Sequence, residues 1–323
     1  MFKQSFIAVA ATLAIGAAQA GAPEKPECIA PAKPGGGFDL TCKLAQGALS
    51  EGKFIDSPMR VTYMPGGIGA VAYNTVIANR PDESGTIVAF SGGSLLNLSI
   101  GKFGKYGVDD VKWLAAVGAD YGAIIVRADS PYKDLKELVA ALKADPTKVV
   151  FGAGGSVGSQ DWLKSALVAK EAGVNYRNMR YVAFEGGGEA MTALLGGHVQ
   201  AYSGDASEVA AHLKGGKVRA LAILSDERLP GELASVPTAK EQGLPVAWAI
   251  IRGYYMGPKV SAEDYQWWVG TFDKLLDTPE FAKLREAQGL FPFKLTGDKL
   301  DAFVKERVTS YAGLAAEFGM IAQ

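Results

Sequence analysis

Short apolar runs alternate with longer amphipathic stretches along most of this chain. The short runs have the length and composition of buried strands, and the amphipathic stretches have the period of helices that cover a sheet. Regular alternation of this kind predicts an α/β fold with largely parallel sheets. We expect strands at 28–32, 60–64, 86–91, 113–117, 123–127, 149–152, 180–183, 201–204 and 218–224. We expect helices at 38–51, 70–78, 135–144, 159–171, 188–195, 207–213, 262–277, 280–288 and 297–317.

Polar turns rich in glycine follow many of the expected strands. In open parallel sheets such turns lie at the carboxyl edge, where ligands bind. The sequence therefore predicts one cleft that these turns line together. They read PGGG at 34–37, PGGIG at 65–69, SGGS at 91–94, GAGGSVGS at 152–159 and FEGGGE at 184–189.

The first of these turns has the chemistry of an anion site. Gly35, Gly36 and Gly37 have no Cβ, so their backbone can aim several N–H groups at one point. The helix expected next adds the partial positive charge of its N-terminus, and Lys33 adds a full charge. Asp39 either stabilises the start of that helix or faces the ligand, and both interpretations stay open here.

Two apolar stretches, 113–127 and 218–225, have the character of crossings between lobes. Such crossings would give a first lobe of residues 22–122 plus 226–323 and a second lobe of residues 123–225. The first two glycine turns would then belong to one lobe and the last two to the other. We expect ligand to draw the lobes together, because neither lobe alone can surround an anion.

The first twenty residues have the pattern of a signal peptide. Lys3 precedes an apolar run at 6–18, and Ala18-Gln19-Ala20 has the small residues that signal peptidase requires. We expect cleavage after Ala20 and export to the periplasm. In that oxidising compartment, Cys28 and Cys42 are expected to form a disulfide rather than a metal site.

Charge and motif content exclude several classes of function. The chain has 33 Lys and Arg against 34 Asp and Glu, a net charge of −1, and an isoelectric point of about 6.2, without the basic excess of a nucleic-acid binder. It has no Walker, HExxH, EF-hand or CxxC motif, so we expect no cofactor and no metal. Asp205 follows an expected strand and would face the cleft, where it could hold a water or a ligand hydroxyl.

Two motifs keep other functions under consideration. The run GIGAVA at 67–72 matches a dinucleotide-binding pattern, but the next strand ends in Ser91-Gly92-Gly93, where an acidic residue should hold the ribose. The run GGSVG at 154–158 matches the nucleophile elbow of serine hydrolases, with Ser156 as the nucleophile. No feature of the sequence marks His198 or His212 as its base. An exported hydrolase remains the alternative of a different class.

Seven ordered blocks cover essentially the whole chain after the signal sequence: ECIAPAKPGGGFDLTCK, MRVTYMPGGIGAVAYN, VAFSGGSLLNLS, GSQDWLKSAL, MRYVAFEGGGE, RLPGELASVPTAKEQG and IIRGYY. Through them the chain resembles the extracytoplasmic solute receptors of the tripartite tricarboxylate transporter family, and in particular its tricarboxylate receptor. The resemblance implies a two-lobed periplasmic-binding-protein fold, or Venus flytrap, with a mostly parallel sheet and flanking helices in each lobe. It implies a non-enzymatic, monomeric receptor that captures citrate-like tricarboxylates and delivers them to a membrane permease. A dicarboxylate or an aromatic carboxylate is the alternative ligand within the same architecture.

The glycine turns and the resemblance together give the candidate ligand-binding residues. The resemblance implies that backbone amides and bridging waters of the first two turns hold the ligand carboxylate. This chain has Ala32-Lys33-Pro34-Gly35 where the family pattern is closer to proline-proline-glycine-glycine, a departure that suits a ligand with extra negative charge. Lys33 and Arg252 are expected to supply the positive charge. The full set is Lys33, Pro34, Gly35, Gly36, Gly37, Phe38, Asp39, Pro65, Gly66, Gly67, Ile68, Gly69, Ser91, Gly92, Ser94, Ser156, Ser159, Gln160, Phe184, Glu185, Gly186, Gly187, Asp205 and Arg252.

Overall fold

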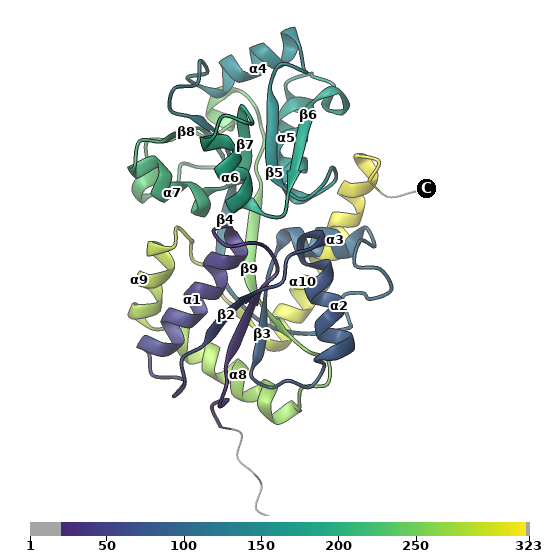
Figure 1. The fold of residues 1–323 in the computed structure, drawn as a ribbon, viewed down its shortest axis with the longest axis vertical. Helices are drawn as coiled ribbons and strands as arrows, with labels where there is room; N and C mark the ends of the chain where they lie inside the picture. The colour runs from purple at the N-terminus through teal and green to yellow at the C-terminus, as the bar shows by residue number, and fades with distance from the viewer. Residues whose placement is uncertain (1–20, 321–323) are drawn as a thin grey trace, which may run out of the picture.

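Two α/β lobes follow one another along the long axis of the molecule in the computed structural model, which describes residues 21–320 (Figure 1). The expected signal sequence lies outside the described residues. Within residues 21–320, no helix is both long and apolar enough to cross a membrane. The flytrap architecture expected from the sequence is confirmed, although its sheet is mixed rather than mostly parallel.

The first lobe is built on three parallel strands, β1 (Glu27–Ala30), β2 (Arg60–Tyr63) and β3 (Thr86–Ser91). β1 lies in the middle, so that Cys28 pairs with Val61 on one side and Ile87 on the other. The expected disulfide joins Cys28 to Cys42, with the two Cα atoms 5.5 Å apart, and so ties the first helix to β1. The helices of this lobe are α1 (Gly37–Glu51), α2 (Ala70–Asn79), α3 (Gly92–Ser99), α8 (Ala262–Leu275) and α9 (Pro279–Ala287).

The second lobe repeats this plan. Its strands β5 (Val150–Gly154), β6 (Arg180–Phe184) and β7 (Ala201–Asp205) are parallel, and β5 lies between the other two. An additional strand, β8 (Val218–Leu224), pairs with the end of a strand that both lobes share. The helices are α4 (Leu135–Ala144), α5 (Gln160–Glu171), α6 (Gly187–Leu195) and α7 (Ala206–Lys214).

Two long strands connect the lobes. β4 (Lys112–Arg127) is one continuous strand where the sequence suggested two, and β9 (Ala249–Met256) was not expected as a strand at all. The first half of β4 pairs with β9 in the first lobe, and its second half pairs with β7 and β8 in the second. All of these pairings are antiparallel, as are those of β9 with β3 and of the short β10 (Leu295–Thr296) with β4, and they make the sheet mixed.

The connection between β8 and β9 packs with the second lobe, whereas the sequence assigned it to the first. It contains two 3₁₀ turns, Gly231–Leu233 and Lys240–Gln242. Ala239 N–H donates to the carbonyl of Ile223 at 3.0 Å, and the Gln242 side chain donates to Leu221 in the same strand at 2.9 Å. We therefore propose that the second crossing lies at the start of β9 rather than at residue 225.

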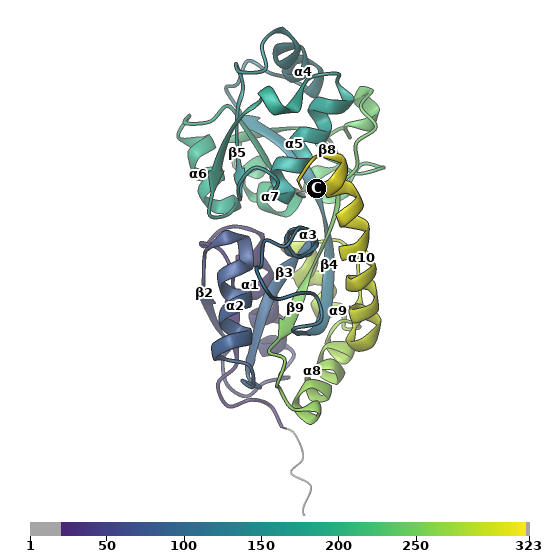
Figure 2. The same cartoon turned by 90° about the vertical axis from the view of Figure 1, so that its right-hand side faces the viewer.

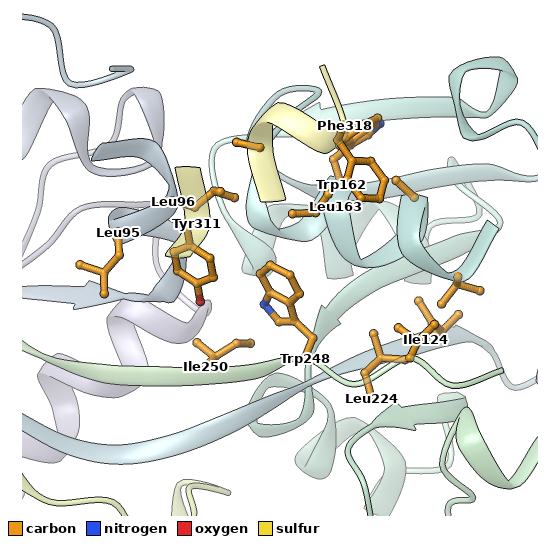
Figure 3. Packing of buried hydrophobic residues seen from close by; sticks show 14 of the residues in the cluster. Leu95, Leu96, Ile124, Trp162, Leu163, Leu224, Trp248, Ile250, Tyr311 and Phe318 are labelled. Carbon is orange, nitrogen blue, oxygen red and sulfur yellow. The ribbon is translucent and has the colours of Figure 1, made fainter. Parts of the chain in front are cut away.

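The last helix, α10 (Gly297–Glu317), runs beside the crossing strands and extends alongside both lobes (Figure 2). Tyr311 stacks on Trp248 with ring centroids 5.8 Å apart, and Phe318 lies 6.3 Å from Trp162 of α5. These rings belong to one buried apolar cluster that continues from the first lobe into the second (Figure 3). The lobes therefore share hydrophobic packing on this side of the molecule.

Candidate functional site

The glycine turns of the two lobes meet around a small inner cavity of about 40 Å³. By position it is the cleft that the sequence predicted, because turns from β1, β3, β5 and β6 all contribute to its wall. Its volume has room for little more than water, so the lobes stand close together here. The expected residues that line it are Gly36, Gly37, Phe38, Ile68, Ser91, Ser159, Gln160, Gly186, Gly187, Asp205 and Arg252.

A larger outer cavity of about 370 Å³ adjoins the inner one, and Ile68, Asn97 and Ser159 line both. This volume lies within the range of small-molecule sites. Ile68 holds a left-handed backbone conformation, with φ 46°, which a β-branched residue adopts only under strain. The expected residues that line only the outer cavity are Gly67, Ser156, Phe184 and Glu185.

Nine expected residues line neither cavity. Asp39 is buried and accepts hydrogen bonds from the Gly35 N–H and the Tyr63 hydroxyl, each at 2.8 Å, so its carboxylate holds the first turn in shape. Ser94 closes a reciprocal capping pair with Ser91 at the start of α3. The nine are Lys33, Pro34, Gly35, Asp39, Pro65, Gly66, Gly69, Gly92 and Ser94.

Some of the turns at the cavities lead into a helix that starts on glycine. α3 and α5 also begin at the inner cavity, but there the side chains of Ser91 and Ser159 cap the helix. The N-cap residues of α1 and α6 are Gly36 and Gly186, which have no side chain to satisfy the first amides. The 3₁₀ turn Gly67–Gly69 before α2 likewise follows Gly66. By contrast, the side chains of Asp134, Ser261 and Thr278 cap α4, α8 and α9. At the glycine starts, the first amides are thus left for another acceptor.

One such acceptor comes from across the cleft. Glu208 of α7 accepts a hydrogen bond from the Gly37 N–H at 2.8 Å with one carboxyl oxygen. Its other oxygen accepts bonds from the Asp205 N–H and the Tyr202 hydroxyl. Burial raises the pKa of Glu208 to about 7, and the charges of Asp205 and Asp161 add to this effect.

A buried charge network lies at the base of the cleft. The Arg252 guanidinium on β9 is 2% exposed and contacts Asp120 Oδ2 at 2.7 Å and Asp205 Oδ2 at 2.6 Å. Lys164 of α5 forms ion pairs with Asp205 and, at 2.9 Å, with Asp161. Burial alone would raise the pKa of Asp205, but the two cations lower it below its usual value. Arg252 lines the inner cavity, but two aspartates already neutralise it.

Lys33 also has a partner. Its ammonium lies 2.5 Å from Glu189 Oε1 in α6, at the exposed rim of the cleft. The pair joins the first turn of one lobe to the last turn of the other. Neither of the two cations expected from the sequence is therefore free for a ligand.

Several residues at the site were not found by sequence reasoning. Asn97 is buried in α3, and its Oδ1 has no hydrogen-bond partner in the described part of the chain. Asp161 and Glu208 line the inner cavity, while Lys102 and Glu189 line the outer one. Glu189 closes the glycine turn at 184–189, and Asp161 follows the turn at 152–159, whereas Asn97, Lys102 and Glu208 carry no such signal.

Two observations concern the metal and the hydrolase considered from the sequence. No group of three His, Cys, Asp or Glu side chains that could hold a metal occurs in residues 21–320. Ser156 lines the outer cavity, but no hydrogen bond joins it to His198 or His212 among the described residues.

Cavities between two lobes joined by crossing strands are typical of solute receptors, and comparison with known proteins specifies the family. The model of the tripartite tricarboxylate transporter family receptor, TctC, matches residues 45–320. The chain belongs to this family of periplasmic solute-binding proteins, which are not enzymes, so the hydrolase alternative is excluded.

Individual relatives agree with this assignment. The chain is 26% identical to the protein BugT of Bordetella pertussis over 92% of this chain and 90% of that protein. It is 27% identical to a UPF0065 protein in the gbd 5′ region of Cupriavidus necator, over 66% of this chain and 63% of that protein.

Solved structures share the fold. The periplasmic binding protein BugD is 23% identical, with a TM-score of 0.83 over 93% of this chain and 100% of that chain. MatC of Rhodopseudomonas palustris with bound malate is 21% identical, with a TM-score of 0.77 over 90% and 98% of the two chains. An R. palustris protein with adipate is 19% identical, with a TM-score of 0.81 over 91% and 97%.

Proposed function

We propose that this protein is a periplasmic receptor for small di- or tricarboxylates, which it captures between its lobes and delivers to a tripartite permease. The observation that carries the proposal is the set of uncapped glycine amides at the paired cavities. The starts of α1 and α6 and the Gly67–Gly69 turn all lack a side-chain cap there. Backbone amides with a helix dipole behind them bind carboxylates without a buried counter-charge. Binding of this kind is readily reversible, as delivery to a permease requires.

Glu208 supports the same chemistry from within the protein. Its carboxyl group bonds to the Gly37 amide at 2.8 Å, so the first turn of α1 has the geometry to receive a carboxylate oxygen. A ligand carboxylate would use the neighbouring amides or displace this group.

The number of carboxylates on the ligand is the finer part of the proposal. Citrate follows from the likeness to tricarboxylate receptors. Malate and adipate, which occupy two structures of the same fold, represent dicarboxylates. With Lys33 and Arg252 both paired, a ligand with two carboxylates needs less compensation than one with three.

A carboxylate panel tests the function. We expect citrate, malate or adipate at 100 times its dissociation constant to raise the free energy of unfolding by about 2.7 kcal/mol, whereas glucose should not. Isothermal titration would give the affinities, and the ligand should be recovered unchanged.

A matched pair of glycine variants tests the site. Gly67 and Gly101 both have positive φ, of 59° and 71°, but of the two only Gly67 lines a cavity of the cleft. Valine strains the backbone at either position, but only at Gly67 does the strain act on amides at the cavity. Gly67→Val should therefore weaken the binding of every carboxylate by about tenfold or more, while Gly101→Val should leave affinity unchanged. Failure of all carboxylates to bind, or equal effects of the two variants, would overturn the proposal.

A further inference from the structure

The cations around the cleft differ in whether a carboxylate already neutralises them. Lys33 pairs with Glu189, Lys164 with two aspartates, and Arg252 with two aspartates. A cation that is already paired gains little from a ligand carboxylate, because the new contact replaces an existing one. Attraction of a second anionic group therefore requires a cation without such a partner.

Lys102 is such a cation. It lies in the turn after α3, lines the outer cavity and also lines a neighbouring cavity of about 460 Å³. Its ammonium donates one long hydrogen bond, of 3.4 Å, to the carbonyl of Val157 in the opposite lobe. No carboxylate lies within ion-pair distance of it in the described part of the chain. Surrounding protein atoms lower the pKa of Lys102 through burial, a cost that a nearby anion would offset.

The outer cavity also holds negative charge, which limits what it can accept. Glu189 lines it but is paired with Lys33, and Glu185 lines it without an ion-pair partner among the described residues. One unpaired ammonium and one unpaired carboxylate leave the cavity without excess positive charge. Lys102 can therefore compensate the charge of one additional carboxylate and no more. Coulomb interactions would direct that carboxylate toward Lys102 and away from Glu185.

From this arrangement we infer that Lys102 binds the distal carboxylate of the ligand, and that it selects dicarboxylates over monocarboxylates of the same length. The inference rests on the proposed carboxylate-receptor function and adds the residue that determines the charge of the ligand. The proximal carboxylate lies at the uncapped amides, and the carbon chain passes Ile68 and Asn97, which line both cavities. Closing the lobes brings the Lys102 ammonium against the turn of Val157 and so completes this second subsite.

The test compares adipate with hexanoate, which differ by the distal carboxylate, in three variants. Lys102→Met keeps the stem and removes the charge, and Lys102→Arg keeps the charge. Lys105→Met is the matched control, since Lys105 lies three residues further along the same turn, against Tyr106, and lines neither cleft cavity. Affinities come from isothermal titration, and thermal melts check that each variant is folded.

In the native protein, adipate should bind at least about tenfold more tightly than hexanoate, as expected for a hydrogen bond to a charged group. Lys102→Met should reduce this ratio to within about twofold of unity, while Lys102→Arg and Lys105→Met should retain it. A ratio unchanged in Lys102→Met, while adipate still binds, would overturn the role of Lys102 and leave the receptor function standing. Absence of binding by citrate, malate, adipate and hexanoate alike would instead overturn the receptor function on which the inference rests.

Discussion

Glu208 of the second lobe accepts a hydrogen bond from the Gly37 N–H of the first lobe at 2.8 Å. This bond joins the start of α7 to the first turn of α1 directly across the cleft. A carboxyl group thus lies where the helix dipole of α1 is most positive. The state of this one side chain consequently affects both the closure of the lobes and the electrostatics of the inner cavity.

Stability should depend on pH through Glu208. Burial raises its pKa to about 7, above the unfolded value of about 4.5, so the folded protein keeps a proton that the unfolded chain releases. This contribution to stability is fully present below about pH 4.5 and is lost as pH rises to 7. Urea unfolding of Glu208→Gln should therefore show a shallower decline between pH 5 and 7, by up to about 1.4 kcal/mol per pH unit. Glu241→Gln is the control because hydrogen bonds to Thr238 and Arg228 lower the pKa of Glu241; identical slopes in all three proteins would contradict the assignment.

Two glycines in α1 should respond in opposite directions to alanine. A Cβ at Gly37 would collide with the Arg252 guanidinium, whereas a Cβ at Gly47 meets nothing within 4 Å. We expect Gly37→Ala to lose about 1–3 kcal/mol of unfolding free energy by overpacking a buried site. Gly47→Ala should gain about 0.5–1 kcal/mol, because alanine favours the helix. Urea denaturation of both variants decides the matter, and a stabilised Gly37→Ala would show that this contact is not tight.

Removing the Arg252 charge should destabilise the fold itself. The guanidinium is 2% exposed, and Arg252→Met would leave Asp120 and Asp205 buried without it. Loss of one partner from a buried ion pair costs about 3–5 kcal/mol. Arg228→Met, which removes an exposed pair with Glu241, should change stability little. A folded Arg252→Met protein of native stability that had lost only ligand affinity would instead return Arg252 to a direct role in binding.

The disulfide should contribute to stability without contributing to binding. Cys28 and Cys42 are fully buried, and their sequence separation is 14. In the chain-entropy model, closing a loop of this size stabilises the fold by about 3 kcal/mol. The free energy of unfolding of the double alanine variant, measured with urea, should be lower by that amount. Reduction of the native protein should produce a similar loss, whereas carboxylate affinity at low temperature should not change. Equal stability of oxidised and reduced protein would contradict this prediction.

The parts of the site that follow from local chemistry could be read from the sequence. A glycine turn after a strand needs no knowledge of the partner lobe, so the turns that include Gly36, Gly67 and Gly186 were expected at one cleft, and they line its cavities. The lobe crossings were harder to find. The sequence predicted separate strands at 113–117 and 123–127, whereas pairing with β9 and then with β7 and β8 keeps β4 continuous.

Residues whose role depends on the other lobe could not be found this way. β9 carries Arg252 in its middle. A charged residue inside an apolar run argues against a buried strand unless its partners are known, and the two aspartate partners of Arg252 lie 132 and 47 residues away along the chain. α3 begins with Gly92-Gly93, which has the appearance of a turn until the Ser91 side chain is seen to cap it. Lys102 and Glu208 have no neighbouring signal, and tertiary contacts alone bring them to the cleft.

The position of α10 makes the two edges of the cleft mechanically unequal. On the side of α10, which we call the hinge side, the crossing strands connect the lobes. The Trp248–Tyr311 stack and the contact of Phe318 with Trp162 add buried packing there. On the opposite side, where β2 and α6 lie in Figure 2, the exposed Lys33–Glu189 ion pair joins the lobes. An exposed ion pair of this kind contributes little to stability. The lobes would therefore separate by rotation about the hinge side, and solute would enter and leave at the opposite edge of the cleft. The surface at that edge would differ between a loaded and an empty receptor.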